Sequence, residues 1–194
     1  WVSPAGINLY FSIVLYPAMS SLRRLTMATS LAVARGVADV CGLDATIKWP
    51  NDIRVNGKKL CGILLESALE DGRVRHAVVG VGLNVNFNAD SYPEIVTTAT
   101  SLMIEKQRQL SRENVLVAVL QQIDQTYRAL TDGCDLREPW RLMLETLGQR
   151  VHVMGGSQIE RGLAEDVDDE GNLILLKDDN SRVVLTAGEV TLQT

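Results

Sequence analysis

Histidine and cysteine are scarce in this chain of 194 residues, and their scarcity narrows the chemistry that it can perform. His76 and His152 stand apart from any acid–histidine spacing, which disfavours a histidine-based zinc site or a hydrolase triad. Cys41, Cys61 and Cys134 are odd in number and form no C-x-x-C pair, a pattern typical of a reducing compartment. Candidate chemistry therefore has to depend on other side chains.

Long apolar runs and an excess of positive charge are also missing. No stretch approaches the roughly 18 apolar residues that a bilayer span needs, and no signal-peptide pattern occurs, so we expect a cytoplasmic protein without a membrane partner. The formal charge is −5, and residues 148–194 account for it with 4 basic against 9 acidic residues. Without a basic face for counterion release, we expect no DNA binding by this chain.

Common nucleotide and hydrolase motifs are absent as well. The run Gly80-Val81-Gly82 continues to Val85, where a dinucleotide fingerprint requires its third glycine, and it lies in a strand-like segment instead of opening a helix. Neither the P-loop pattern nor the G-x-S-x-G nucleophile pattern occurs. A dinucleotide-binding fingerprint, a P-loop and a G-x-S-x-G nucleophile site are therefore disfavoured.

Hydrophobic periodicity predicts an α+β fold. Alanines at helical spacing predict a helix over 20–41, and the residues Leu116, Leu120, Ile123, Tyr127 and Leu130 predict another over 111–130. A shorter helix is expected over 137–147. Asn56-Gly57 and Asp71-Gly72 are typical hairpin turns, and they separate strand-like runs. Strands are expected at 7–16, 46–49, 53–55, 59–69 and 74–85.

The texture of the chain changes near Leu147. Beyond it, short apolar runs alternate with Gly, Asn and Asp clusters, which indicates a small β-barrel. We therefore expect two domains. Residues 1–147 form a mixed, mostly antiparallel sheet flanked by helices, and residues 148–194 form the barrel.

One polar cluster stands out. Lys48, Asn51 and Asp52 surround Pro50, and further lysines follow at 58 and 59. Ammonium groups beside a carboxylate at the mouth of a sheet are suited to handling anions. For Lys58 the simpler interpretation, a lysine that keeps a hairpin soluble, is preferred. The residues alone leave Lys59 open between that role and ligand contact.

Three ordered motifs resemble the biotin protein ligase family. They are KWPND at 48–52, GKKLCGILLE at 57–66 and GVGLN at 80–84. The segment WVSPAGINLYFS at 1–12 also resembles the strand that follows the nucleotide loop of that family, and AGEV at 187–190 fits its closing strand. The resemblance implies a ligase catalytic domain followed by a small SH3-like β-barrel.

The resemblance implies a two-step ligation that uses ATP and Mg²⁺. The carboxylate of biotin attacks the α-phosphate of ATP, and the product is biotinyl-5′-AMP. A lysine of a biotin carboxyl carrier domain then forms an amide and releases AMP. Lys59 matches the family's essential lysine and is assigned to the reacting carboxylate and phosphate. Asp52 is assigned to orient or deprotonate the incoming amine.

The remaining site residues are also assigned by this resemblance. Together with Lys59, the biotin pocket is expected to include Gly62, Ile63, Leu64 and Gly82.

ATP binding is expected from Trp1, Lys48, Asn51 and Asn84, with Asn84 a candidate for the metal shell, although no metal ligand is firmly assigned. For Asn51 a turn cap after Pro50 is the alternative. Trp1 is a candidate stacking residue for adenine.

Parts of the family pattern are not in this chain. The family's arginine-rich loop should stand immediately before Trp1, so we expect a chain that lacks its N-terminal part and is weakly active or inactive by itself. The family often dimerises by pairing of sheet edges, which is a candidate here. Two other functions remain open, namely a lipoate or octanoate ligase and a ligand-binding remnant without catalysis.

Overall fold

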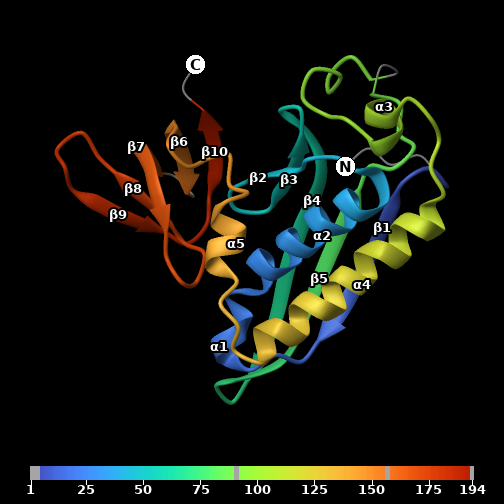
Figure 1. Ribbon diagram of the computed structural model, residues 1–194. Coiled ribbons are helices and arrows are strands. Elements are labelled where there is room, and N and C mark those ends of the chain that lie inside the picture. Colours follow the sequence, from blue (N-terminus) through green and yellow to red (C-terminus); the bar gives the residue numbers. More distant parts are fainter. Residues whose placement is uncertain (1–4, 90–91, 156–157, 193–194) are drawn as a thin grey trace.

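Two five-stranded antiparallel sheets, one from each part of the chain, form the framework of the protein (Figure 1). The computed structural model describes residues 5–89, 92–155 and 158–192. The first sheet has the order β1-β5-β4-β3-β2. Its strands are β1 (Leu9–Leu15), β2 (Thr46–Lys48), β3 (Asp52–Val55), β4 (Lys58–Glu70) and β5 (Arg73–Leu83). The expected α+β architecture is therefore confirmed. Among the described residues, parallel contacts occur only as two isolated bridges, from Ile47 to Leu144 and from Lys59 to Ala99.

Two long helices cover one face of the first sheet (Figure 1). These are α2 (Leu25–Cys41) and α4 (Arg112–Thr131), and they lie side by side. Gly36 of α2 permits the approach, because a Cβ there would lie 2.9 Å from the Cα of Val119. The buried stripe of α4 therefore includes Val119, and the neighbouring Leu120 is 39% exposed. Leu120, one of the periodic residues that predicted this helix, therefore lies outside the buried stripe, because the closest helix contact selects the stripe next to it.

Short helices complete the first part of the chain. The helix expected over 20–41 is divided into α1 (Met19–Leu22) and α2, and the N-cap of α1 is Ala18. At the other end, Gly42 adopts the left-handed conformation that ends α2. The remaining helices are α3 (Leu102–Lys106) and α5 (Arg137–Arg141), the latter shorter than expected because turns follow it.

Both predicted hairpin turns are confirmed. Asn56 and Gly57 have φ values of 50° and 75°, and Asp71 and Gly72 have values of 49° and 74°. Positive φ at both central residues is the geometry of a type I′ turn, which matches the twist of the strands. The alternation of buried and exposed residues along β4 does not continue to Leu69, which is 58% exposed. A register shift between Ala68 and Leu69 interrupts the alternation there.

The opposite face of the first sheet carries no helix of the described residues. Large side chains on it are exposed, among them Tyr10 at 43%, Val14 at 52% and Leu64 at 60%. Gly62, Gly80 and Gly82 of β4 and β5 lie on the same face. Because these residues have no side chains, the backbone is uncovered at this part of the sheet. This open face is the framework of the site described below.

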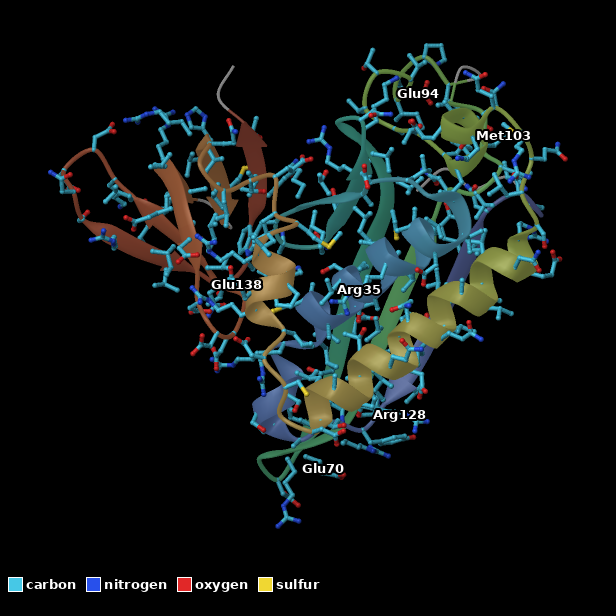
Figure 2. The ribbon with its side chains drawn as sticks, in the orientation of Figure 1. Arg35, Glu70, Glu94, Met103, Arg128 and Glu138 are labelled. Atoms are coloured by element: carbon cyan, nitrogen blue, oxygen red, sulfur yellow. The ribbon has the colours of Figure 1, made fainter. Side chains whose placement is uncertain are left out.

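The second sheet follows α5 and has the order β10-β6-β7-β8-β9. Its inward-facing residues form an apolar core, while charged residues lie outside. Figure 2 shows the charged side chains around the surface, for example Glu70 at the tip of the β4–β5 hairpin and Arg128 on α4. The strands are β6 (Arg150–Gly155), β7 (Gln158–Val167), β8 (Leu173–Leu176), β9 (Arg182–Leu185) and β10 (Glu189–Leu192). No helix of the described residues is long and apolar enough to cross a membrane.

Candidate functional site

A β-bulge places Lys59 on the open face of the first sheet. Asp52 pairs with Gly62 and Ile53 with Cys61, but Arg54 pairs with Lys59, so the register shifts by one residue between Ile53 and Arg54. In an uninterrupted strand, Lys59 would share the buried face of Cys61. The bulge turns the lysine toward Asp52, and this is a common use of bulges next to functional sites.

Lys59 and Asp52 form a close ion pair. The distance from Lys59 Nζ to Asp52 Oδ1 is 2.6 Å, and the two side chains are 42% and 22% exposed. A mobile surface lysine would lose rotamer freedom in such a contact for little gain. Here the carboxylate is fixed by its place in β3, so the ammonium group has a defined position at the edge of a cavity.

The turn that carries Asp52 is itself attached to β4. The side-chain amide of Asn51 donates a hydrogen bond of 2.7 Å to the carbonyl oxygen of Ile63, and the backbone N–H of Ile63 donates to the carbonyl oxygen of Asn51 at 3.1 Å. The side-chain amide of Asn51 thus holds the turn against β4, and this role does not depend on a bound ligand. Ile63 is 2% exposed, so the attachment point is part of the core.

Three adjoining cavities meet on this face. The first, of about 320 Å³, is lined by the predicted residues Lys48, Asn51, Asp52, Lys59, Gly62, Ile63 and Leu64, together with Gly188, Glu189 and Val190 of the second sheet. The second, of about 410 Å³, lies on a floor of Gly62, Gly80 and Gly82. The third, of about 290 Å³, has Lys59 and Asn84 in its wall. Lys59 stands between the first and the third.

The glycine floor follows from the strand register. Tyr10, Gly82, Gly62, Asp52 and Lys48 are successive partners across all five strands of the sheet. Two of the five have no side chain, so a flat group could lie against the backbone between Tyr10 and the charged end of the row. The adjacent row contains Gly80, where an added Cβ would meet Leu64 at 3.7 Å, an ordinary contact distance. The fold therefore does not require a glycine at position 80, and an alanine would fit there.

The third cavity uses a segment that sequence reasoning missed. Besides Lys59 and Asn84 it is lined by Tyr10, Leu60, Cys61, Phe87, Ile95 and Ala99. Phe87 stacks on Tyr92 with ring centroids 5.1 Å apart. The described residues of this segment, 85–89 and 92–101, have irregular structure, so no periodic signal identifies it. Phenylalanine is rare here, with two in the chain, and its position three residues after Asn84 was the available clue.

Asn84 helps to fix that segment. Its amide nitrogen donates to the carbonyl oxygen of Thr100 at 3.0 Å, and its oxygen accepts from the amide of Asn8 at 3.4 Å. Within the described residues no group of three or more His, Cys, Asp or Glu side chains could hold a metal ion. The donors present fit a magnesium ion bound mainly by nucleotide phosphates, with few protein ligands.

Cys61 lies beside the Lys59–Asp52 pair, and its thiol is unreactive. Its side chain is 1% exposed, and burial, with the charge of Asp52, raises the pKa of the thiol far above its ordinary value. A thiol that stays protonated is a poor nucleophile. Trp1, the remaining predicted site residue, lies outside the described residues.

Comparisons with known proteins agree with this geometry. Residues 1–84 match the Biotin/lipoate A/B protein ligase family, and residues 146–192 match the Biotin protein ligase C terminal domain. The chain is 32% identical to the biotin–[acetyl-CoA-carboxylase] ligase of Paracoccus denitrificans, covering 98% of this chain and 82% of that protein.

Two further relatives extend the comparison. The bifunctional ligase/repressor BirA of Bacillus spizizenii is also 32% identical, over 96% of this chain. The chain spans 59% of the length of that relative. A solved structure of the biotin protein ligase from Aquifex aeolicus in complex with biotin and ATP superposes with a TM-score of 0.81 at 25% identity. That match covers 96% of this chain and 78% of that one.

Proposed function

We propose that this chain, which belongs to the biotin protein ligase family, carries the catalytic face for ATP-dependent attachment of biotin to a lysine of a carrier protein. The observation that supports this most directly is the place of Lys59 between two cavities. Two anions have to meet in the first step, and a fixed ammonium group at their meeting point stabilises the charge that develops there.

In the first step, a carboxylate oxygen of biotin forms a bond to the α-phosphorus of ATP. The bond from that phosphorus to the bridging oxygen of the β-phosphate breaks, and pyrophosphate leaves with the electron pair. Lys59 contacts the carboxylate and the α-phosphate together, and it keeps its proton throughout. Asp52 at 2.6 Å sets the position of the ammonium group before the substrates enter.

In the second step, the amine of the carrier lysine attacks the carbonyl carbon of biotinyl-5′-AMP. The C–O bond to the phosphate breaks, and AMP leaves with that oxygen. The amine must lose a proton as the amide forms. We assign Asp52, which lines the same cavity as Lys59, to orient the amine and to accept that proton. The side chain of Asp52 is 22% exposed, so it is not sealed from solvent.

Biotin binds on the glycine floor in this proposal. Gly62 and Gly82 let its rings approach the backbone, Leu64 contributes apolar contact, and Lys59 receives the carboxylate. Ile63, also assigned to this pocket from the resemblance, would contribute its backbone alone, because its side chain is 2% exposed and lies on the buried face of the sheet. Leu64 is 60% exposed, so the ligand would cover apolar surface that is otherwise open to water.

ATP is assigned to the cavity on the other side of Lys59. Its adenine would contact the apolar wall at Phe87 and Ile95, and Asn84 stands beside the phosphates. Lys48 and Asn51 line the neighbouring cavity and are assigned to the phosphates or the ribose. Mg²⁺, when bound, neutralises phosphate charge, and no direct protein ligand is assigned to it.

The domain division and the partners are also proposals. Residues 1–147 would form the catalytic domain and 148–194 an SH3-like barrel, with a biotin carboxyl carrier domain as acceptor. Among the described strands, β3 pairs with β4 only from Lys58 to Gly62, so the rest of β4 pairs with β5 alone. This free edge supports a homodimer formed by sheet pairing. The free cysteines support a cytoplasmic location, and no role in DNA binding is proposed.

The test compares biotin with lipoate. The chain, and a longer form carrying the sequence that precedes Trp1, are incubated with ATP, Mg²⁺ and either acid, and pyrophosphate release is followed. Release that requires biotin supports the proposal, and subsequent transfer to a carrier domain completes it. Release with lipoate alone would favour the lipoate ligase alternative, and no release in either form would favour the remnant without catalysis.

A further inference from the structure

Trp49 connects the turn that carries Asp52 to the second part of the chain. Its side chain is 1% exposed, and its indole N–H donates a hydrogen bond of 2.9 Å to the carbonyl oxygen of Gly171. Its backbone N–H donates to the hydroxyl of Thr146 at 3.0 Å. The residue at the start of the turn is thus attached at two points to segments about 100 residues away in the sequence.

The turn that accepts this bond, residues 168–172, is rigid. The carboxylate of Asp168 accepts from the backbone N–H groups of Glu170 and Asn172 and from the side chain of Asn172, all within 2.8–2.9 Å. Gly171 has a φ of +82°, which other residues rarely adopt. Its carbonyl oxygen is therefore presented in a fixed position.

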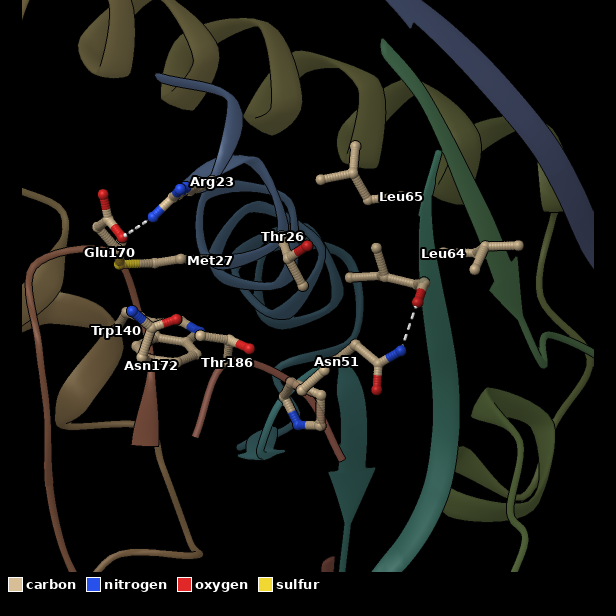
Figure 3. Close-up of a pocket in the computed structure, with 14 residues that line it drawn as sticks. Arg23, Thr26, Met27, Asn51, Leu64, Leu65, Trp140, Glu170, Asn172 and Thr186 are labelled. Carbon is tan, nitrogen blue, oxygen red and sulfur yellow. Dashed lines mark hydrogen bonds and ion pairs between the residues drawn. The ribbon is translucent and has the colours of Figure 1, made fainter. Parts of the chain in front are cut away.

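The same turn is tied to the first part of the chain beside a cavity of about 580 Å³ (Figure 3). Glu170 pairs with Arg23 at 2.8 Å, and Figure 3 shows this pair on one side of the cavity and Asn51, bonded to Ile63, on the other. The exposed ion pair contributes little by itself. The partly buried indole bond is the stronger attachment, because an unpaired donor in the core is costly.

From Trp49 the contacts run directly to the reactive pair. Asn51, two residues on, is bonded to Ile63, and Asp52 follows it and pairs with Lys59. A shift of Trp49 therefore moves the carboxylate that sets the position of the lysine ammonium group. Small displacements of this kind can lower a rate considerably without removing any contact to substrate.

We propose that Trp49 is a positioning residue whose indole bond to Gly171 couples the second sheet to the geometry of the Asp52–Lys59 pair. The inference rests on the proposed function for its kinetic effect and on the structure alone for the coupling. The alternative is that Trp49 only fills the core. These two roles differ in which measurements respond to loss of the indole N–H.

Trp140 provides a matched control. It is also 1% exposed, and its indole N–H donates to the hydroxyl of Ser30 on α2 at 2.8 Å. Trp140→Phe removes an indole bond, as Trp49→Phe does. Because the bond of Trp140 is buried and that of Trp49 is partly buried, the melting temperature should fall at least as far in Trp140→Phe as in Trp49→Phe. The ring of Trp140 also lies against Gly171, since a Cβ there would be 3.7 Å from two of its ring carbons, but neither Trp140 nor Ser30 is bonded to the turn that carries Asp52. Trp140→Phe therefore changes the packing beside Gly171 and keeps the bond from Trp49, so the pair of variants separates loss of that bond from loss of packing.

The first measurement needs no substrate. Amide hydrogen exchange is followed at Ile63, whose N–H is bonded to the carbonyl oxygen of Asn51. We expect exchange there to increase about tenfold in Trp49→Phe relative to Trp140→Phe when the two are compared at equal global stability. Equal exchange at Ile63 in both variants would overturn the coupling.

The second measurement is the kinetics of biotinyl-5′-AMP formation in the longer form. We expect Trp49→Phe to lower kcat about tenfold with KM for biotin and ATP within about twofold, and Trp140→Phe to leave kcat within about twofold. Similar kcat values in both variants would overturn the positioning role. If the unmodified protein makes no adenylate, the proposed function fails, and exchange at Ile63 still decides the coupling.

Gly171→Ala tests the acceptor while Trp49 is kept. At a φ of +82° an alanine is strained, so the carbonyl oxygen should move away from the indole. We expect Ile63 exchange and kcat to change in the same direction as in Trp49→Phe. Unchanged values in a folded Gly171→Ala protein would contradict the assignment of Gly171 as the partner that matters.

Discussion

The two sheets differ in how they use charge and glycine. In the second sheet, acidic side chains meet basic partners on the surface, as in Lys177–Glu160 at 2.7 Å, Arg182–Glu165 at 2.6 Å and Arg150–Asp178 at 2.8 Å. In the first sheet, Lys59 and Asp52 pair at 2.6 Å where cavities meet, next to a floor of glycines. The contacts are equally short, but their surroundings are different.

This difference shows that the environment of an ion pair decides what it can do. A pair on a convex surface is screened by water and adds little stability. A pair at the mouth of a cavity acts on whatever enters that cavity, because a bound ligand displaces water and so reduces the screening of the pair. The acidic excess of residues 148–194 therefore says little about the site, which depends on a few cations in the right place.

The strongest test of this comparison replaces each of two neighbouring lysines with alanine and compares the two variants. Lys59→Ala should lower the rate of adenylate formation by about 10²–10³, because the charge at the meeting point is lost. Lys58→Ala should stay within about twofold of the unmodified protein, since the Nζ of Lys58 donates to the carbonyl oxygen of Val96 away from the pair. Pyrophosphate release measures both. Equal losses in the two variants would remove Lys59 from its proposed role.

The glycine floor is tested by adding one methyl group. The cavity around Gly80 has room for a Cβ at ordinary contact distances, so Gly80→Ala should fold normally and occupy ligand space. We expect KM for biotin to increase about fivefold to tenfold with the melting temperature within about 2 °C. Gly155→Ala in the second sheet is the control, since its added Cβ would lie 3.8 Å from Ala187 O. An unchanged KM in Gly80→Ala would place the ligand elsewhere.

A smaller effect is expected where the second sheet meets α5. Asp166 accepts hydrogen bonds from Arg137 and Arg141 at 3.1 and 2.6 Å. Burial alone would raise the pKa of its carboxyl, but the bond from Arg141 and the nearby charges keep that pKa below its ordinary value. We expect Asp166→Asn to lower the melting temperature by about 2–4 °C at pH 7.

This stabilisation should depend on pH. Because the folded-state pKa of Asp166 is below the unfolded value of about 3.9, the contribution is complete above that value and is lost as the pH falls through the folded pKa. Melting curves from pH 7 to pH 3 should therefore show the difference between Asp166→Asn and the unmodified protein shrinking in acid. Asp178→Asn, which breaks an exposed pair, should change the melting temperature by less than about 1 °C.

The smallest expected effect concerns the thiols. Cys134 is exposed, whereas Cys41 and Cys61 are buried, and burial raises the pKa of both buried thiols. Iodoacetamide at pH 8 should modify one thiol per folded chain, at Cys134, and leave adenylate formation within about 1.5-fold. Mass spectrometry identifies the modified residue. Rapid modification of Cys61 would show that the wall of the third cavity is open to solvent.

Local patterns predicted much of the fold correctly. The Asn56-Gly57 and Asp71-Gly72 turns require positive φ at both positions, so their residues indicated the hairpins directly. Long helices followed from periodicity, and on α4 only Leu120 among the five periodic residues lies outside the buried side. Leu120 and Val119 are equally apolar, and the close contact at Gly36 selects Val119. Sequence patterns therefore found the elements more reliably than their contacts.

The site was predicted less completely. The five residues of KWPND line one cavity together with Lys59, Gly62, Ile63 and Leu64, and their roles there stay a prediction. Phe87 and Ile95 were missed because an irregular segment has no period to recognise. Glu189 enters the same cavity as Lys59 from the second sheet, 130 residues away, and no local pattern indicates such a contact.

The sequence by itself determined which residues carry charge and which positions have no side chain, together with the turns, strands and helices that nearest neighbours dictate. Only the tertiary structure decided which way Lys59 points, because a one-residue bulge reverses the side of the sheet. It alone also decided that Trp49 meets Gly171. The physical reason is that backbone conformation depends on adjacent residues, whereas a cavity and its ion pair depend on packing between segments far apart in the chain.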